Sequence, residues 1–240
     1  MRNYFTFGSV DSRSFGVYIS GSGVFNAPER AMNFINVPGR NGALIGNEDR
    51  FENIDVTYPA FIAPVGGIDF KDKITKLRSA LLSITSYARL EDSYNSSEFR
   101  QAVFVGGLDV DPTQILDAGK FNLTFNCKPQ RWLTSGEQEG IHYVSGGEEY
   151  NPSKFDSLPR IKVYGYGTFY IGSQAITVAN AYPTVTIDSE LGDCYSGTEN
   201  ANSVVSFGND HFPVLSYGSN VITFPNTITE IDVLPRWWRI

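Results

Sequence analysis

Apolar and polar residues alternate over several short stretches of the chain, as they do in strands that bury one face and expose the other. In residues 54–58 the apolar positions are Ile54, Val56 and Tyr58, and polar residues stand between them. Residues 121–127 repeat the pattern, with Phe, Leu, Phe and Cys at alternate positions, and Pro129 follows. Because proline cannot donate a ladder hydrogen bond, we expect the second strand to end there.

A turn signal separates two apolar runs early in the chain. Residues 35–37 (Ile-Asn-Val) and 43–45 (Ala-Leu-Ile) flank the sequence Pro-Gly-Arg-Asn-Gly at positions 38–42. Pro-Gly favours a type II turn, and Asn-Gly favours the type I′ turn of hairpins. We therefore predict a β-hairpin at this point of the chain.

One segment has the period of a long amphipathic helix. Asp69 can cap its first turn, and basic residues occupy the rest of its surface, which we interpret as a solvated face. The apolar positions recur every three or four residues, at Phe70, Ile74, Leu77, Leu81 and Ile84. The basic residues are Lys71, Lys73, Lys76 and Arg78.

The composition changes over residues 133–156, where Thr, Ser, Gly, Glu and Asn dominate. Gly146-Gly147 and Asn151-Pro152 are chain breakers, so we predict a linker there. Beyond it come short strand-like runs joined by turns, which is typical of a β-sandwich. They lie at residues 160–164, 168–171, 175–178, 184–187, 203–207, 221–224 and 228–234. The predicted fold is mainly β with one long helix: an N-terminal β-rich domain at 1–132, the linker at 133–156 and a C-terminal sandwich at 157–240.

Two of the three tryptophans of the chain, Trp237 and Trp238, stand at its C-terminal end. A frayed terminus gains nothing from such large apolar side chains, so we predict a docked strand with one Trp buried and the other half exposed. An alternative makes the outer Trp a binding platform. Tyr164 and Tyr166 could join Trp237 or Trp238 in a surface for a partner protein or a glycan.

Charged residues make up 19% of the chain, and its formal net charge is −7. Binding to phosphate backbones needs clustered Lys and Arg, so we predict no nucleic-acid partner. No run approaches the roughly 18 apolar residues of a membrane helix, and no signal-peptide pattern opens the chain. We therefore expect that the protein is made in a cytosol and that it does not associate with a membrane. Cys127 and Cys194 are expected to be reduced packing residues.

Candidate chemistry is sparse. With two histidines, His142 and His211, and no Gly-x-Ser-x-Gly elbow, the chain offers little for a nucleophilic relay. Asp188 and Glu190 are the best carboxylate pair, since two residues apart on a strand they share a face. Residues 109–111 (Asp-Val-Asp) lack the rest of a calcium loop, and residues 165–167 (Gly-Tyr-Gly) lack the rest of a dinucleotide site. We predict no catalytic, cofactor or metal site and no enzyme activity.

Taken in order, several motifs resemble one known family, the distal tail (Dit) proteins of long-tailed phages that infect Gram-positive bacteria. Residues 37–42 (Val-Pro-Gly-Arg-Asn-Gly) resemble its N-terminal hairpin, and residues 125–132 (Phe-Asn-Cys-Lys-Pro-Gln-Arg-Trp) resemble the strand that closes its N-terminal domain. Each motif alone is a sequence common in turns and strands. Together they occur in the family's order and spacing over nearly the whole chain. The others lie at residues 158–165, 186–190, 212–220 and 235–238.

This resemblance implies a ring-forming N-terminal domain that assembles as a homo-hexamer at the tail tip and an outward galectin-like sandwich. It also implies partners in the virion: the tail tube protein, the tape measure protein, the tail-associated hub protein and a receptor-binding protein. The protein would be made in the host bacterial cytoplasm and would end in the phage tail tip. No active site of the family carries over to this chain.

Two functions from different classes follow. The first is a structural hub that joins the tail tube to the host-adhesion apparatus. The alternative is a carbohydrate-binding or glycan-cleaving β-sandwich module, because exposed aromatic faces beside polar groups bind sugars. A ring needs strand edges and aromatic patches rather than charged pockets, so the sparse chemistry favours the hub.

Overall fold

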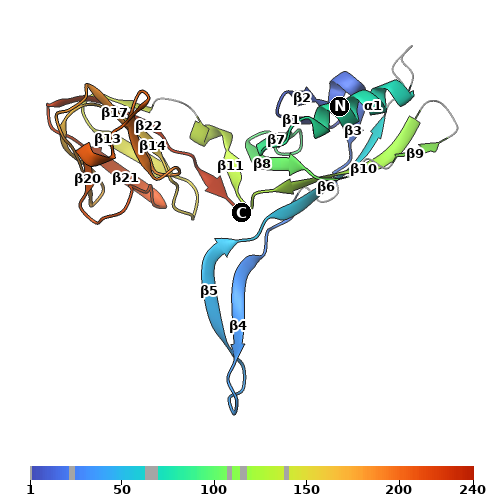
Figure 1. Ribbon diagram of the computed structural model, residues 1–240, viewed down its shortest axis with the longest axis horizontal. Coiled ribbons are helices and arrows are strands. Elements are labelled where there is room, and N and C mark those ends of the chain that lie inside the picture. The colour runs from blue at the N-terminus through green and yellow to red at the C-terminus, as the bar shows by residue number, and fades with distance from the viewer. Residues whose placement is uncertain (1, 22–24, 63–69, 107–109, 114–117, 138–140) are drawn as a thin grey trace. The chain divides into compact units, whose positions relative to one another are not determined.

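The computed structural model describes residues 2–21, 25–62, 70–106, 110–113, 118–137 and 141–240. They divide into two compact units, Met1–Arg131 with Ile240, and Trp132–Arg239. Both units are mostly β (Figure 1), which confirms the predicted fold class at that level. Two residues weighed in the sequence, the helix cap Asp69 and the calcium-loop candidate Asp109, lie outside the described residues.

The first unit is built on an antiparallel sheet in the order β2-β1-β7-β8-β10-β6-β3, with β9 beside β10. Its longest pairing joins β6 and β10 over eight residue pairs, from Lys120 opposite Phe61 to Cys127 opposite Ile54. The strands are β1 (Phe5–Phe7), β2 (Val10–Asp11), β3 (Val17–Ile19), β6 (Ile54–Ile62), β7 (Ala88–Asp92), β8 (Glu98–Phe104), β9 (Val110–Thr113) and β10 (Ala118–Cys127), with a 3-10 turn η1 (Ser12–Phe15).

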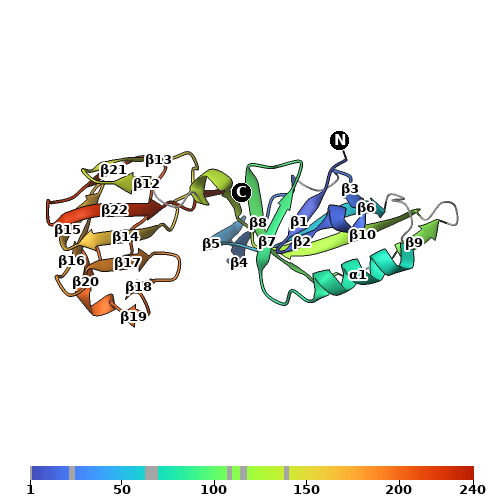
Figure 2. The ribbon, with the colours of Figure 1, turned by 90° about the horizontal axis from the view of Figure 1, so that it is seen from above.

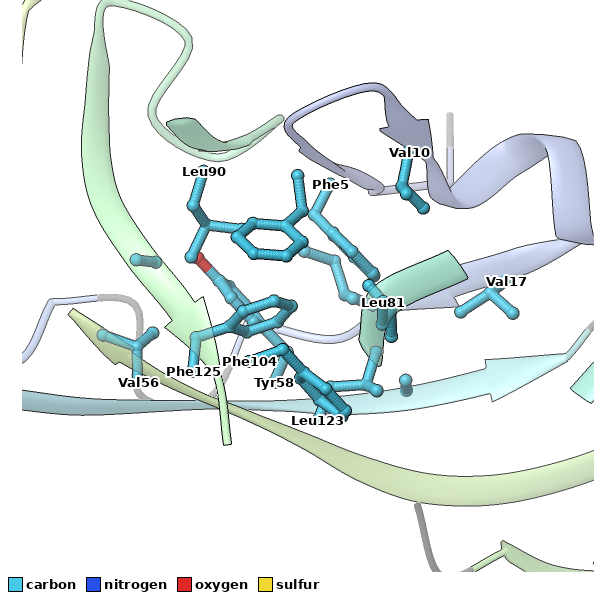
Figure 3. Close-up of a cluster of buried hydrophobic side chains, with 14 of the residues drawn as sticks. Phe5, Val10, Val17, Val56, Tyr58, Leu81, Leu90, Phe104, Leu123 and Phe125 are labelled. Atoms are coloured by element: carbon cyan, nitrogen blue, oxygen red, sulfur yellow. The ribbon is translucent and has the colours of Figure 1, made fainter. Parts of the chain in front are cut away.

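An aromatic cluster fills the core of the first unit (Figure 3). The ring of Phe125 is the centre, with its centroid 5.6 Å from that of Phe5, 5.1 Å from Phe7 and 5.3 Å from Phe104. Edge-to-face contacts of this kind add to the area that each ring buries. The alternation predicted for β10 is confirmed, because Phe121, Leu123, Phe125 and Cys127 are all buried.

The predicted helix is α1 (Phe70–Leu82), and it covers one face of this sheet (Figure 1). Leu77 and Leu81 are fully buried, as their spacing predicts. The helix ends before Ile84, which packs against the core from the following turn. One basic residue differs from the expected solvated face, since Lys73 is 8% exposed.

The predicted hairpin is present but is longer than its turn signal indicates. It consists of β4 (Arg30–Asn36) and β5 (Ala43–Phe51), which form a separate two-stranded sheet (Figure 1). The Arg40 amide donates to the Val37 carbonyl at 3.2 Å, and Gly39 has φ +77°. This is the expected type II turn. The Asn-Gly type I′ turn is not formed, because it requires positive φ at Asn41, and Asn41 does not have it.

The second unit is a sandwich of a six-stranded sheet, β12-β22-β14-β17-β18-β19, and a five-stranded sheet, β13-β21-β15-β16-β20. Figure 2 shows β22, β14, β17 and β18 side by side. Buried aliphatic residues from both sheets, with Trp237, make one core. The strands are β12 (Ile141–Tyr143), β13 (Gly147–Asn151), β14 (Arg160–Gly165), β15 (Gly167–Ile171), β16 (Gln174–Val178), β17 (Thr184–Asp188), β18 (Asp193–Ser196), β19 (Glu199–Asn200), β20 (Val205–Phe207), β21 (Gly218–Thr223) and β22 (Ile228–Leu234).

The structure corrects the linker predicted over residues 133–156. This stretch contains β12, which pairs with β22, and β13, which pairs with β21. It also contains the 3-10 turn η2 (Thr134–Glu137). The residues that suggested a linker bend the chain between paired strands, since Gly146 has φ +82°. The stretch therefore belongs to the sheets of the second unit. Among the described helices, none has the length and apolar character to cross a bilayer.

Candidate functional site

A polar groove lies on the outer face of the six-stranded sheet. Alternation along β14 turns Ile161 and Val163 into the core and Lys162 outward. Strand register places Lys162 directly between Asp232 of β22 and Thr186 of β17. The groove has a volume of about 390 Å³. It is lined by Arg160, Lys162, Thr186, Tyr195, Asp232, Val233 and Leu234.

Tyr164, one of the predicted surface residues, lies at the border of this groove. Its hydroxyl donates to Asp232 Oδ2 at 3.2 Å. Lys162 Nζ stands over the Tyr164 ring, 4.7 Å from the centroid. The hydrogen bond to Tyr164 raises the pKa of Lys162 above its usual value, and the charges of Asp232 and Glu230 act in the same direction. Tyr164 thus contacts both the cation and the anion that line the groove, Lys162 and Asp232.

His142 extends the polar row to β12, at the edge of the sheet. It is the register partner of Asp232. Its Nδ1 lies 2.8 Å from Glu230 Oε1 and 3.1 Å from Asp232 Oδ1. Together the three side chains could hold a metal ion, although the sequence predicted no metal site. No sequence signal could have found this group, because it depends on pairing between strands that are about ninety residues apart.

The two C-terminal tryptophans have different surroundings. Trp237 is 4% exposed in the sandwich core. Trp238 is half-buried in β23 (Trp238–Arg239), where its ring stacks on Phe155 at 4.5 Å and its Nε1 donates to the Asp156 carbonyl at 3.0 Å. Its own carbonyl accepts from Ser153 Oγ. The strand is docked against β11 (Arg131–Leu133), as expected for this terminus.

The four predicted surface residues therefore do not form one binding face. Tyr164 borders the groove, and Trp237 is enclosed in the core. Tyr166 lies in the bend between β14 and β15, 41% exposed, with its amide donating to the Thr227 carbonyl at 3.3 Å. Trp238 is held by contacts with the separate chain segment around Phe155.

The carboxylate pair weighed as an acid and base shares a single guanidinium. Arg236 Nη1 lies 2.6 Å from Asp188 Oδ1 and 3.3 Å from Glu190 Oε2. Burial acts to raise the pKa of Asp188, but the hydrogen bonds from Arg236 and from backbone amides outweigh it, and the pKa is lowered. A general acid needs a raised pKa, so this arrangement does not fit that role.

The cysteines are free, buried and poorly suited to nucleophilic chemistry. Burial raises the pKa of Cys127 to about 12 and that of Cys194 to about 11. The thiolate, which is the reactive form, is then scarce at neutral pH. Both side chains belong to the hydrophobic cores, Cys127 in the first unit and Cys194 in the second.

Comparison with known proteins bears on the fold. No protein-family model and no curated protein matches the chain. The crystal structure of the Dit protein of phage SPP1, which its authors call a paradigm of the hub adsorption apparatus in phages infecting Gram-positive bacteria, is similar with a TM-score of 0.76, at 10% identity over 100% of both chains. A chain of the phage p2 baseplate, in its activated conformation with Ca, is similar with a TM-score of 0.50, at 10% identity over 97% of both chains. This chain thus has the fold of the SPP1 Dit hub protein along its whole length, and the resemblance inferred from the sequence motifs is confirmed in the fold.

Proposed function

We propose that this protein is a structural component of a phage tail, the distal hub that joins the tail tube to the host-adhesion apparatus, and that it is not an enzyme. The observation that carries the proposal is the match of both units, in order and over the full length, to the Dit protein of phage SPP1. Fold alone does not define function. Two features of this chain's own surface support the same role.

The first feature is the apolar surface of the hairpin formed by β4 and β5. Phe34 and Ile45 are register partners on one face, and Ile35 and Leu44 are register partners on the other. All four are between 42% and 66% exposed. A two-stranded sheet with uncovered apolar faces is marginally stable in water and marks an interaction site. Our proposal is that neighbouring copies cover these faces in a closed, head-to-tail homo-hexameric ring.

The second feature is that, in the described part of the chain, the candidate carboxylates and thiols are not arranged for catalysis. Arg236 contacts both carboxylates of the Asp188–Glu190 pair, and both thiols are buried in hydrophobic cores. In this proposal the second unit is a galectin-like sandwich that faces outward and docks other tail proteins. The partners are the tail tube protein, the tape measure protein, the tail-associated hub protein and a receptor-binding protein. The protein is made in the cytoplasm of the host bacterium and resides in the tail tip of the virion.

The alternative is a carbohydrate-binding module, and the groove on the six-stranded sheet is the observation that favours it. Tyr195 offers a ring, while Lys162, Thr186 and Asp232 offer polar groups to sugar hydroxyls. Titration with cell-wall saccharides at millimolar concentration separates the two functions. Saturable binding that is lost in Lys162→Ala with the fold intact would support the module, and no binding is what the docking role predicts.

The hub role is tested on whole virions. Antibodies against the second unit, carried on gold particles, should label the end of the tail distal to the capsid, and mass spectrometry should find the chain in purified particles. Antibodies against a capsid protein of the same phage are the control for specific labelling. A chain that is absent from purified virions, yet abundant in the infected cell, would contradict the proposal.

A further inference from the structure

His142, Glu230 and Asp232 meet on the outer face of the sheet, where β12 pairs with β22. His142 and Asp232 are direct register partners, and Glu230 stands two residues earlier on the same strand and hence on the same face. His142 Nδ1 lies 2.8 Å from Glu230 Oε1 and 3.1 Å from Asp232 Oδ1. The pairing of two hydrogen-bonded strands therefore brings the three side chains together on one face.

We propose that these three residues form a binding site for a divalent first-row transition ion of the zinc type. Imidazole nitrogen and carboxylate oxygen are both zinc ligands, three protein ligands suffice for an open zinc site, and the candidate atoms here all lie within 4.8 Å of one another. In a tetrahedral shell, metal–ligand bonds of about 2.0–2.2 Å place neighbouring donor atoms about 3.3–3.6 Å apart. The imidazole–carboxylate distances of 2.8 and 3.1 Å must therefore open by less than about 1 Å to admit an ion. An ion between them needs only small changes in side-chain torsions.

The donor set selects the class of ion. Imidazole suits Zn²⁺, Co²⁺ and Ni²⁺, whereas Ca²⁺ and Mg²⁺ prefer shells made of oxygen. The side chain of His142 is 53% exposed and those of Glu230 and Asp232 are 27% and 26% exposed. The site is therefore open to water, which leaves a coordination position for a solvent molecule or for a ligand from another protein.

The surroundings both support and limit the site. Tyr164 donates its hydroxyl to the other oxygen of Asp232, Oδ2, at 3.2 Å, which orients that carboxylate as outer-shell groups do around metals. Lys162 lies across the Tyr164 ring, and its positive charge opposes a bound cation. The site thus binds more weakly than a closed structural zinc site does. Removing the charge of Lys162 should tighten it.

The test uses the full chain, with Zn²⁺ titrated in a calorimeter and Co²⁺ titrated by its visible absorption. We expect one saturable site for either ion and none for Ca²⁺ or Mg²⁺. His142→Ala should weaken binding at least tenfold, and Tyr164→Phe should weaken it by up to about tenfold. Lys162→Gln should strengthen it. His211→Ala is the matched control, since it removes the other histidine of the chain, and it should leave the affinity unchanged.

Circular dichroism and thermal melting of each variant without metal establish that the fold is intact. Absence of saturable Zn²⁺ binding up to millimolar concentration would overturn the proposal and leave the three residues as an ion-paired cluster. Equal affinity in the parent chain and His142→Ala would overturn it as well, because the bound ion would then lie elsewhere. Neither result bears on the hub role, which rests on the fold and on the hairpin.

Discussion

The guanidinium of Arg236 donates two hydrogen bonds to the carboxylate of Asp188, from Nη1 to Oδ1 at 2.6 Å and from Nη2 to Oδ2 at 2.9 Å. Asp188 is only 2% exposed at the end of β17. Arg236 precedes the buried Trp237 and holds an uncommon φ of +56°. A bidentate pair of this kind fixes orientation as well as distance. It ties the C-terminal segment to the six-stranded sheet.

Breaking this pair should destabilise the second unit. Asp188→Asn leaves a mostly buried guanidinium without its bidentate carboxylate and with only the more exposed Glu190 beside it. We expect a loss of about 3 kcal/mol in the free energy of unfolding at pH 7. Urea denaturation followed by circular dichroism measures it. Glu190→Gln is the matched control, because Glu190 is 43% exposed beside the same Arg236 and should cost under about 1 kcal/mol. Equal losses of stability in the two variants would contradict the stabilising role of the Arg236–Asp188 pair.

The same pair should make stability depend on pH. The pKa of Asp188 is lowered from 3.8: burial acts to raise it, but hydrogen bonds from Arg236 and from backbone amides prevail. A carboxylate with a lowered pKa in the folded state stabilises that state above its unfolded pKa, and the contribution is lost as the pH falls through the folded pKa. The stability difference between parent chain and Asp188→Asn should therefore be full at pH 6 and shrink below pH 3.8. A difference that grows on acidification would be inconsistent with this sign.

Gly165 should tolerate no side chain. It sits at a register shift between β14 and β22 with φ +111°, and a Cβ there would lie 2.2 Å from the Thr227 carbonyl oxygen. We expect Gly165→Ala to cost at least about 3 kcal/mol, since strain and a backbone clash add. Gly172→Ala is the control: φ is +58° but nothing lies within 4 Å, so the cost should be about 1 kcal/mol. Thermal melting of both variants measures the two losses of stability. The difference between them is the part caused by the clash with the Thr227 carbonyl, because both glycines have positive φ.

The adjacent tryptophans should respond differently to substitution and to quenching. Trp237→Ala removes a buried core side chain and should cost about 3–5 kcal/mol, whereas Trp238→Ala should cost about 1–2 kcal/mol. Because Trp132 and Trp237 are both buried, the emission of the folded protein should be blue-shifted. Iodide should quench only the fraction from Trp238. If Trp238→Phe leaves the quenched fraction unchanged, Trp238 is less exposed than described.

Local patterns were sufficient to predict several elements. The alternation in β6 and β10 and the three-and-four spacing in α1 each record which face is buried, and a single strand or helix carries that information by itself. The Pro-Gly turn was predictable for the same reason, because Pro38 and Gly39 set their own backbone angles.

Other features depend on partners far along the chain, which a period cannot identify. β12 and β13 looked like linker because Gly146 and Gly147 break local patterns, yet both strands are held by pairing with β22 and β21. The groove has the same origin, since alternation turns Lys162 outward but only the register sets Asp232 beside it. The hairpin was underestimated because apolar residues on both of its faces erase the alternation.

Imaging of the purified protein by electron microscopy tests the hub assignment most directly, alone and after mixing with its tail partners. We expect class averages of a closed six-fold ring, lost when Phe34→Ser and Ile45→Ser remove the apolar face of the hairpin while circular dichroism stays unchanged. Tyr170→Ser, which alters an exposed aromatic of the second unit, should leave the ring intact. A protein that stays monomeric at tens of micromolar, and forms no ring even with its tail partners, would contradict the hub role.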